Sequence, residues 1–469
     1  MTKRSTVRPI RTYLAISVLT LATMLSAQDT RNVTEPTIPP ACTTLTAHLA
    51  ATATGVDPAD ETKLDTARIQ KAIDHCSKGH AVALRPQGDK NAFLSGPIEL
   101  RQGVTLLIDK NTTLYASRDP KLYEISSGSC GVVNYQRSGC RPFITVDHAD
   151  DSAIMGDGAI DGRGGSKLLG QNLTWWDLAE QARPPGSGRQ QVPRLIVANY
   201  SDNFILYRIT LKNSPNFHVS YNHGDGFTVW GVKIDTPQRL EYQPHGIARN
   251  TDGIDPGASK NITIIHSYIR TGDDNIAIKG GPGGVTNMTV IHNHFYWGHG
   301  MSIGSETNGG VSKIRVTDLS LDGPDNAIRI KSNASRGGLV QDVVYDDICI
   351  RNSPNPIIFS TAYTEAGSMQ GNLLPVFRDI TLRNVRISGG GKISFDGYDH
   401  THRAAATLDN VLVTDDSHYT YSLDHADITL GPGPVNLDLP TGTDSAIHGT
   451  PSKGTPQSCA DKFVPFPTQ

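Results

Sequence analysis

Three short segments follow one another at steps of 26 residues: Asn261-Ile262-Thr263-Ile264, Asn287-Met288-Thr289-Val290 and Lys313-Ile314-Arg315-Val316. Each begins with a polar residue and continues as a run typical of a β-strand. Similar runs begin at Asn203 and Phe227 on one side, and near Asp342 and Asp379 on the other. The sequence is therefore internally repetitive over much of its length.

The repeat decides the fold class. Self-similarity at a period of 20–50 residues indicates a solenoid, and units of short strands without a helix favour a parallel β-helix over an ankyrin or leucine-rich array. A β-sandwich and a propeller are the alternatives. The hairpins of a sandwich would give sharper two-residue turn signals, and a propeller would give a more constant period. We therefore predict an all-β, single-domain parallel β-helix (solenoid) over residues 42–469.

Other segments flank the repeats. Apolar spacing predicts a short amphipathic helix at residues 65–76, which we place as an N-terminal capping helix, and weaker spacing suggests another at Trp175–Gln181. Residues 28–41 are polar and contain prolines, which predicts a flexible lead-in. The tail from about residue 431 is rich in Gly and Pro and is predicted to pack over the last coils.

Residues 1–27 have the composition of a secretory signal peptide. Four cationic side chains lie among the first 11 residues, residues 13–25 are apolar and uncharged, and Ser26-Ala27 supplies small residues. An uncleaved membrane anchor is the alternative, but 13 residues are short for a span. We expect a secreted protein, extracellular or periplasmic in transit, with no membrane association after cleavage. Removal of residues 1–27 would change the formal net charge from −3 to −7.

Six cysteines lie in the exported part, and an even number in an exported protein suggests disulfides. Cys130 and Cys140 flank a short loop and are the favoured pair. Cys42 with Cys76 and Cys349 with Cys459 are weaker suggestions, because six cysteines allow fifteen pairings. The slight acidic excess also argues against a nucleic-acid partner.

Four chemical motifs recur at steps close to the repeat length: Asn250-Thr251-Asp252-Gly253-Ile254-Asp255, Gly272-Asp273-Asp274-Asn275, Gly298-His299-Gly300 and Arg329-Ile330-Lys331. Residues one coil apart in a β-helix stack at the strand spacing of about 4.8 Å. The motifs are therefore predicted to form one column on one face. Each motif alone is more often a turn or a solvated strand face. What is informative is that all four motifs recur at about the length of the repeat.

The predicted column suits hydrolysis of an acidic polysaccharide. Glycoside hydrolysis needs a carboxylic acid to protonate the leaving oxygen and a carboxylate opposite it, and Asp252, Asp273 and Asp274 supply carboxyl groups. We expect their mutual repulsion to raise at least one pKa, and His299 to hydrogen-bond the acid. Arg329 and Lys331 point the same way on a strand and suit a substrate carboxylate.

No metal or other cofactor is predicted. The cysteines lack Cys-x-x-Cys spacing, and the alternating His292 and His294 lack an evident third ligand.

The four motifs, in this order and at these intervals, resemble those of the polygalacturonases, and the likeness to bacterial endo-polygalacturonases covers roughly residues 60–430. Further similar segments are Cys130-Gly131-Val132-Val133, Gly139-Cys140, Trp175-Trp176, Asn213-Ser214-Pro215-Asn216-Phe217-His218 and Gly224-Asp225-Gly226-Phe227. The resemblance implies a right-handed β-helix that hydrolyses α-1,4-galacturonan (pectin) with inversion and without a cofactor.

The resemblance also implies roles for single residues. Asp273 would be the general acid, Asp252 and Asp274 would activate water, and His299 would tune the acid. Arg329 and Lys331 would hold the galacturonate carboxylate, with Tyr363 packing against a sugar ring. Tyr345 is the competing tyrosine. Asn250 and Lys279 are further candidates in the cleft.

Endo action by a monomer is the expectation. Residues 239–247 look longer than in compact bacterial enzymes, which leaves exo action open. The sequence is also compatible with a rhamnogalacturonan hydrolase, a calcium-dependent pectate lyase or a non-catalytic glycan-binding β-helix.

Overall fold

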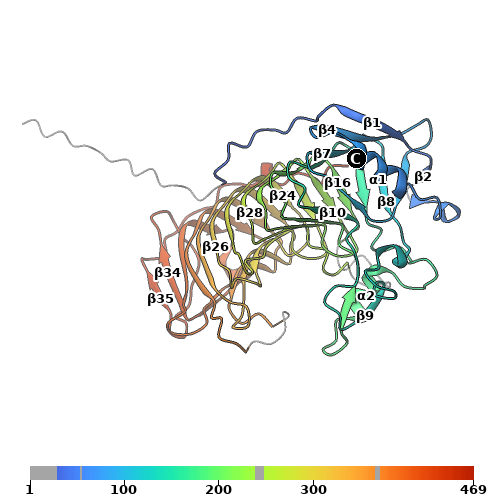
Figure 1. The fold of residues 1–469 in the computed structure, drawn as a ribbon. Helices are drawn as coiled ribbons and strands as arrows, with labels where there is room; N and C mark the ends of the chain where they lie inside the picture. Colours follow the sequence, from blue (N-terminus) through green and yellow to red (C-terminus); the bar gives the residue numbers. More distant parts are fainter. Residues whose placement is uncertain (1–28, 53–54, 238–247, 365–369, 469) are drawn as a thin grey trace, which may run out of the picture.

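The computed structural model describes residues 29–468 except 53–54, 238–247 and 365–369. The chain winds into a right-handed parallel β-helix whose coils stack from the blue N-terminal end to the orange C-terminal end in Figure 1. The predicted signal peptide and the segment 239–247 lie outside the described residues.

One face of the solenoid is an 11-stranded parallel sheet with one strand per coil. Its strands are β6 (Ile98–Glu99), β10 (Ile144–Asp147), β14 (Ile196–Asn199), β17 (Val219–Asn222), β20 (Ile254–Gly257), β23 (Ile276–Ile278), β25 (Met301–Gly304), β27 (Asn326–Lys331), β29 (Asn355–Ser360), β31 (Gly391–Asp396) and β33 (Tyr419–Asp424).

The other faces form a 20-stranded parallel sheet that begins as two ladders. The first ladder holds β1 (Ala41–Thr46), β4 (His80–Arg85), β7 (Val104–Ile108), β11 (Ala153–Met155), β15 (Phe204–Tyr207), β18 (Asp225–Trp230) and β21 (Lys260–Ile265). The second holds β5 (Ala92–Ser95), β8 (Thr113–Ala116), β12 (Ala159–Asp161), β16 (Thr210–Lys212), β19 (Lys233–Asp235) and β22 (Tyr268–Arg270).

The two ladders merge at β24 (Val285–Phe295), which pairs with both β21 and β22. Later coils keep one long strand there: β26 (Val311–Asp322), β28 (Leu339–Arg351), β30 (Val376–Ser388) and β32 (Ala404–Val413), followed by the shorter β34 (Ala426–Leu430) and β35 (Ala446–His448). Two small antiparallel pairs lie outside the solenoid: β2 (Ala51–Thr52) with β3 (Gly55–Val56), and β9 (Val132–Asn134) with β13 (Arg189–Gln191).

The repeated sequence segments pair residue for residue. Ile262 pairs with Met288, and Met288 with Ile314, in β21, β24 and β26. The polar residues that begin the segments, Asn261 and Asn287, have φ of 56° and 58°, a left-handed conformation that asparagine tolerates better than most residues. The side-chain nitrogen of Asn287 donates to Asn261 Oδ1 at 3.3 Å. Each repeated segment therefore begins at a backbone bend, and the asparagines at two of these bends are joined by a hydrogen bond between coils.

Columns of aliphatic side chains fill the interior. In the 11-stranded sheet Ile254, Ile276, Met301, Ile328 and Ile357 follow one another in register, and all five are fully buried. Replacing one such residue by alanine typically costs about 2–5 kcal/mol. Packing along this column keeps successive coils in register. The positions of the side chains on the outer surface depend on that register.

Two α-helices are present among the described residues. Helix α1 (Thr66–His75) buries Ile69 and Ile73 against the first coils, as predicted for a capping helix. Helix α2 (Trp175–Gln181) begins with reciprocal hydrogen bonds between Thr174 and Asp177. Four 3₁₀ turns complete the helical structure of the described part: Pro58–Asp60, Pro120–Tyr123, Asp416–His418 and Ala460–Lys462. Neither of these α-helices could cross a membrane.

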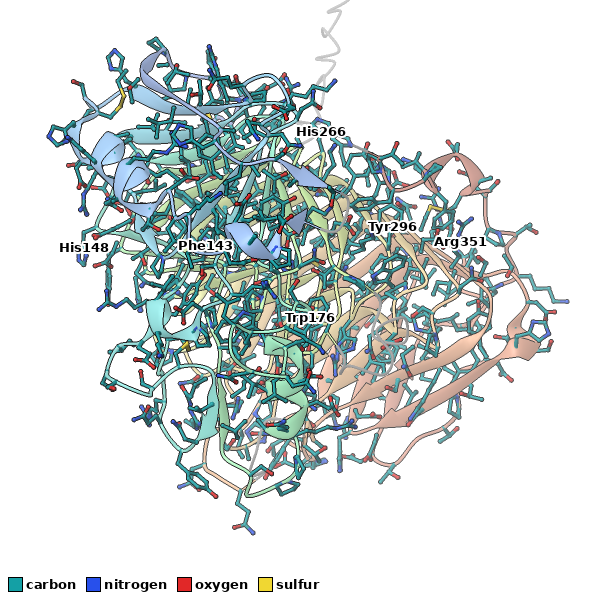
Figure 2. The ribbon with its side chains drawn as sticks, turned by 90° about the vertical axis from the view of Figure 1, so that its right-hand side faces the viewer. Phe143, His148, Trp176, His266, Tyr296 and Arg351 are labelled. Carbon is teal, nitrogen blue, oxygen red and sulfur yellow. A yellow bond between two sulfur atoms is a disulfide. The ribbon has the colours of Figure 1, made fainter. Side chains whose placement is uncertain are left out.

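Helix α2 and the β9–β13 pair project below the solenoid in Figure 1. The indole N–H of Trp176, labelled in Figure 2, donates to the carbonyl oxygen of Ser214 at 2.9 Å and anchors this projection. The disulfide between Cys130 and Cys140 closes its base. The projection matters for function because it lies beside the site described below.

The lead-in that we predicted to be flexible is anchored along the solenoid. Asp29 is buried: its carboxylate accepts from Thr263 at 2.8 Å, and its N–H donates to Thr289 at 2.9 Å. Farther along, the hydroxyl of Tyr207 donates to Glu35 at 2.7 Å. Residues 29–40 hold no helix or strand, yet side-chain contacts fix them to the outer face of the first ladder.

The C-terminal tail reaches farther than the last coils. Cys459 is bonded to Cys349 of β28, and the hydroxyl of Tyr296 donates to the carbonyl oxygen of Val464 at 2.9 Å. The guanidinium of Arg270 lies 4.1 Å from the ring centre of Phe466. The tail thus runs back toward the N-terminal coils, at whose end of the solenoid the C-terminus is marked in Figure 1.

All three suggested disulfides are present: Cys42–Cys76, Cys130–Cys140 and Cys349–Cys459. They join residues 34, 10 and 110 positions apart, and no described cysteine is free.

The long Cys349–Cys459 bridge should contribute most to stability. Chain entropy gives about 5 kcal/mol for its loop, against about 3 kcal/mol for the Cys130–Cys140 loop. We expect Cys349→Ser/Cys459→Ser to lower the denaturation midpoint more than Cys130→Ser/Cys140→Ser, and to make the tail susceptible to limited proteolysis. A larger effect of the second pair would contradict this assignment.

Candidate active site

The four chemical motifs meet at the 11-stranded sheet, as their spacing predicted. Three occupy the turns that enter consecutive strands: Asp252 precedes β20, Asp273 and Asp274 precede β23, and His299 precedes β25. The fourth lies within β27, where Arg329 pairs in register with Ser302 and Lys331 with Gly304. Stacking of the coils therefore brings residues as distant in the chain as Asp252 and Lys331 into one group.

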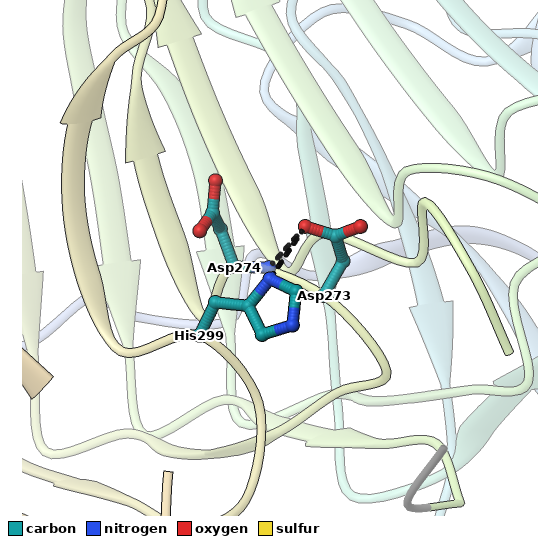
Figure 3. A group of neighbouring side chains, drawn as sticks. All are labelled: Asp273, Asp274 and His299. Atoms are coloured by element: carbon teal, nitrogen blue, oxygen red, sulfur yellow. Dashed lines mark hydrogen bonds and ion pairs between the residues drawn. The ribbon is translucent and has the colours of Figure 1, made fainter. Parts of the chain in front are cut away.

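Asp273 and His299 form an ion pair at the front of this group (Figure 3). Nδ1 of His299 lies 3.2 Å from Oδ1 of Asp273, and the backbone N–H of His299 donates to the carbonyl oxygen of Asp273 at 2.9 Å. Nε2 of His299 lies 3.4 Å from the exposed carboxylate of Asp325. The imidazole is thus held between two carboxylates.

Asp274 is buried and surrounded by donors. Lys331 donates to its Oδ2 and Ser302 to its Oδ1, both at 2.7 Å, and Arg329 lies 3.5 Å from Oδ1. The side chain of Lys331 is itself only 5% exposed. This lysine therefore has a fixed partner inside the protein.

Asp252 and Asp255 share one cation. Nζ of Lys279 lies 3.4 Å from Asp252 and 3.7 Å from Asp255, and both aspartates are buried. Among the described residues, Oδ1 of Asp252 and both carboxylate oxygens of Asp255 lack a hydrogen-bond partner. One lysine thus faces two buried and poorly solvated carboxyl groups.

These surroundings separate the acidities of the aspartates. Burial and then the charge of Asp255 raise the pKa of Asp252 well above its ordinary value, and burial raises the pKa of Asp255 to about 7 against the charge of Lys279. Burial acts on Asp274 in the same sense, but the charge of Lys331 outweighs it and lowers that pKa.

The expected rise of at least one pKa is found at Asp252, whereas the Asp273–His299 pair shows the opposite shift. Burial raises the pKa of Asp273, but the charge of His299 and its hydrogen bond outweigh burial and hold that pKa well below its ordinary value. Burial lowers the pKa of His299, but the charge of Asp273 raises it to about 10. In the free protein at neutral pH the proton of this pair therefore resides on His299.

A cavity of about 530 Å³ exposes most of the group. Asp252, Asp273, Asp274, His299 and Lys331 line it, together with Tyr363, Asn250, Lys279, Phe217, Arg183 and Glu306. The Tyr363 ring centre lies 5.1 Å from Nζ of Lys331 and 5.3 Å from Cζ of Arg329. The competing Tyr345 is fully buried in the core and is excluded from the cavity.

Asn250 links the cavity to the projecting unit. Its N–H donates to Oδ2 of Asp273 at 3.2 Å, and its side-chain oxygen accepts from Gln190 of the projection at 2.8 Å. Arg329 does not line the cavity and instead lies behind it, between Asp274 and Tyr363.

One described group has the geometry to hold a metal ion. Asp273, Asp274 and His299 present ligand atoms within 4.8 Å of one another. Both oxygens of Asp274 already accept from Lys331 and Ser302, so a metal would displace protein donors. The remaining candidates, His292 and His294, hydrogen-bond to Asp318 and Ser320 and are not part of this group.

Sequence reasoning missed Asp325 and assigned no role to Asp255. Asp325 stands 26 residues after His299, immediately before β27, so the spacing that identified the other turns also pointed to it. Its neighbours Gly323-Pro324 gave it the appearance of an ordinary turn residue. Asp255 lay inside a quoted motif, but burial beside Lys279 is visible only in the structure.

The sequence profile of glycosyl hydrolases family 28 matches residues 77–428. This chain belongs to glycoside hydrolase family 28.

Relatives of this family 28 chain align over most of its length. A polygalacturonase of Ralstonia nicotianae is 39% identical over 495 aligned positions, covering 93% of this chain and 92% of that protein. An endo-polygalacturonase of Pectobacterium carotovorum is 43% identical, covering 83% and 91% respectively. The solved polygalacturonase from Erwinia carotovora superposes with a TM-score of 0.77 at 42% identity, covering 86% of this chain and all of that one. The family membership expected from the motifs is confirmed.

Lys331 should stabilise the fold of this family 28 chain. Removing one partner of a buried ion pair costs about 3–5 kcal/mol, because the other charge is left uncompensated. We expect Lys331→Ala to lower the free energy of unfolding by about 3 kcal/mol, measured by chemical denaturation at pH 7.

Two further variants test this interpretation. Lys331→Ala/Asp274→Asn should recover much of the loss, because the double variant no longer buries an unpaired charge. Lys392→Ala, which removes an exposed lysine of β31, should have little effect. If the double variant is as unstable as the single one, Lys331 stabilises the protein through contacts other than Asp274.

Proposed function

We propose that this protein is a secreted endo-polygalacturonase, which hydrolyses α-1,4 bonds between galacturonate residues of pectin with inversion. The observation that carries the proposal is the cavity in which three aspartates, a histidine and two lysines converge. The named polygalacturonases that align over more than four fifths of the chain support it. Cations beside hydrolytic carboxyl groups suit a uronic acid substrate.

Asp273 acts as the general acid in this proposal. Its side chain is 18% exposed, whereas those of Asp252 and Asp274 are 3% and 1% exposed, so it is the most accessible of the three aspartates. The proton of the pair resides on His299 before substrate binds. A bound uronate chain excludes water, which destabilises the ion pair relative to the neutral pair and so favours transfer of that proton to Asp273 and then to the leaving oxygen.

Asp274 and Asp252 activate the attacking water. Asp274 remains ionised because Lys331 lowers its pKa, and it supplies a permanent negative charge. Burial raises the pKa of Asp252, which makes its carboxylate a stronger base, and its Oδ1 is not engaged by any described donor. A water between these groups could pass its proton to Asp252 as it attacks the sugar.

The remaining cavity residues bind the substrate. Lys331 provides positive charge in the cavity for a galacturonate carboxylate, and Arg329, which does not line the cavity, adds to that charge from behind Lys331; both also neutralise Asp274. Tyr363 offers an aromatic face to a sugar ring. Asn250 and Lys279 line the cavity on the side of the projecting unit. We further propose that the protein acts as a monomer and that residues 1–27 direct its export.

A purified mature protein should release reducing ends from polygalacturonate. We expect no ultraviolet absorbance from unsaturated products, no effect of a calcium chelator, and early products of mixed length, as endo hydrolysis requires. Asp273→Asn should lower kcat by at least about 100-fold, the usual contribution of a general acid.

The competing activities give different outcomes in the same assay. Absorbance that disappears with chelator would identify a lyase, and monomer release from the start would identify an exo enzyme. No product at all would favour a glycan-binding protein.

The acid limb of the kcat/KM profile should report Asp252. Ionised Asp252 is required, so activity falls as the pH drops through its pKa. Asp255 raises that pKa and Lys279 lowers it. We therefore expect Asp255→Asn to move the acid limb to lower pH and Lys279→Met to move it to higher pH. Shifts in the same direction would remove Asp252 from the role of base.

A further inference from the structure

The segment 213–218 ends in a histidine that the proposed mechanism does not use. Among the residues that the structure describes, His218 is the only histidine that is fully buried. It immediately precedes β17 and follows Phe217, which lines the catalytic cavity, whereas His218 itself does not. A buried polar ring is costly unless its nitrogens are hydrogen-bonded, so the partners of His218 show what it holds in place.

Both the backbone and the ring of His218 contact one oxygen atom of the next coil. The backbone N–H donates to the carbonyl oxygen of Asp252 at 2.8 Å, and Nδ1 of the ring lies 3.0 Å from the same oxygen. The backbone bond belongs to the stacking of the coils, whereas the contact from the ring is additional. One carbonyl of a catalytic residue is therefore held twice.

The ring of His218 is uncharged at neutral pH. Burial lowers its pKa to about 4. Hydrogen bonds to the backbone of Asp252 and Thr251 and the negative charge of Asp235 act in the opposite sense, but burial outweighs them. The ring therefore carries a single proton, on one of its two nitrogens.

The neighbours of Nε2 place that proton on Nδ1. The backbone N–H of Ser214 donates to Nε2 at 3.4 Å, and the hydroxyl of Thr236 lies 2.8 Å from it. A backbone N–H can only donate, so Nε2 has to be the accepting nitrogen. Nδ1 consequently carries the proton and donates it in a hydrogen bond to the carbonyl oxygen of Asp252.

The two groups that contact Nε2 are fixed in turn. Ser214 and Thr236 are both fully buried. The carbonyl oxygen of Ser214 accepts from the indole of Trp176 at 2.9 Å, and that of Thr236 accepts from the indole of Trp297 at 3.0 Å. The imidazole of His218 is therefore held in one orientation by two anchored neighbours.

The side chain of Asp252 has little of its own to hold it. Its Oδ1 has no hydrogen-bond partner among the described residues, and its Oδ2 lies 3.4 Å from Nζ of Lys279. The position of this carboxylate therefore depends on its backbone. That backbone is fixed on one side by His218 and on the other by the N–H of Gly253, which donates to the carbonyl oxygen of Asp274 at 2.9 Å.

We propose that His218 is a positioning residue for the catalytic base: its Nδ1–H fixes the carbonyl of Asp252, and thereby the place of the carboxylate that receives the proton of the attacking water. The inference rests on the proposed function, because it requires Asp252 to act as that base. Misplacement of a catalytic group by about 1 Å can cost about 100-fold in rate. His218 therefore influences kcat from outside the cavity, through Asp252 alone.

Two substitutions separate the two ring nitrogens. His218→Asn keeps an amide N–H near the position of Nδ1 and loses the acceptor at Nε2. His218→Gln reaches the position of Nε2 with an amide oxygen and loses the donor at Nδ1. The control is His294→Gln, which removes a half-buried imidazole of the outer sheet that hydrogen-bonds to Ser320 at 2.8 Å.

We expect His218→Gln to lower kcat on polygalacturonate by about 10- to 100-fold with little change in KM, because the base moves while the residues that bind substrate do not. His218→Asn should stay much closer to the wild-type kcat, and the control should follow the wild type. Chemical denaturation of all variants at pH 7 shows whether a loss of kcat accompanies a loss of folded protein.

A double-variant cycle tests whether His218 acts through Asp252. In an Asp252→Asn background, His218→Gln should cost much less in kcat than it does in the wild type, because the group that it positions is already lost. An equal cost in both backgrounds would overturn the inference, since it would show a general structural effect.

Other results would also overturn the inference. These are a folded His218→Gln protein with wild-type kcat, and an equal loss of kcat in the Asn and Gln variants. If His218→Gln does not fold, folded His218→Asn decides, since it has to keep kcat although both contacts of Nε2 are lost. An inactive wild type would instead reject the proposed function, and wild-type kcat in Asp252→Asn would reject the proposed base.

Discussion

Each coil of this protein can satisfy its strand hydrogen bonds only through the coils before and after it. That constraint fixes the rise per coil at the spacing between paired strands, about 4.8 Å, and makes register the property on which everything else depends. Ile254, Ile276 and Met301 keep register inside the solenoid. Outside it, the same register brings Asp252, Asp273 and His299 to one place, although none is close to another in sequence. A slip of one residue would exchange the inner and outer faces.

Stacking at this distance places the aspartates of the active site close together, and each of them has a cationic side chain beside it. Lys279 is paired with Asp252 and Asp255. His299 is paired with Asp273, and Lys331 with Asp274. The number and distance of these cations differ between coils, so chemically identical aspartates acquire different acidities. His299 holds the pKa of Asp273 well below its ordinary value, and Asp273 in turn raises the pKa of His299, so the proton of that pair lies on the imidazole. In the proposed mechanism the catalytic proton is therefore held on the imidazole beside Asp273, and exclusion of water by the substrate favours its return.

Sequence alone predicted the architecture because the repeat is periodic and its polar first residues, such as Asn261 and Asn287, take a backbone conformation that few residue types accept. The same periodicity predicted that the four chemical motifs would meet on one face of the solenoid. It did not give the acidities, because burial and the partner of each aspartate depend on distances of a few ångströms between coils. Asp325 was missed although its spacing was right. The anchored residues 29–40 and the long path of the tail were also missed, since irregular segments have no period to reveal where they lie.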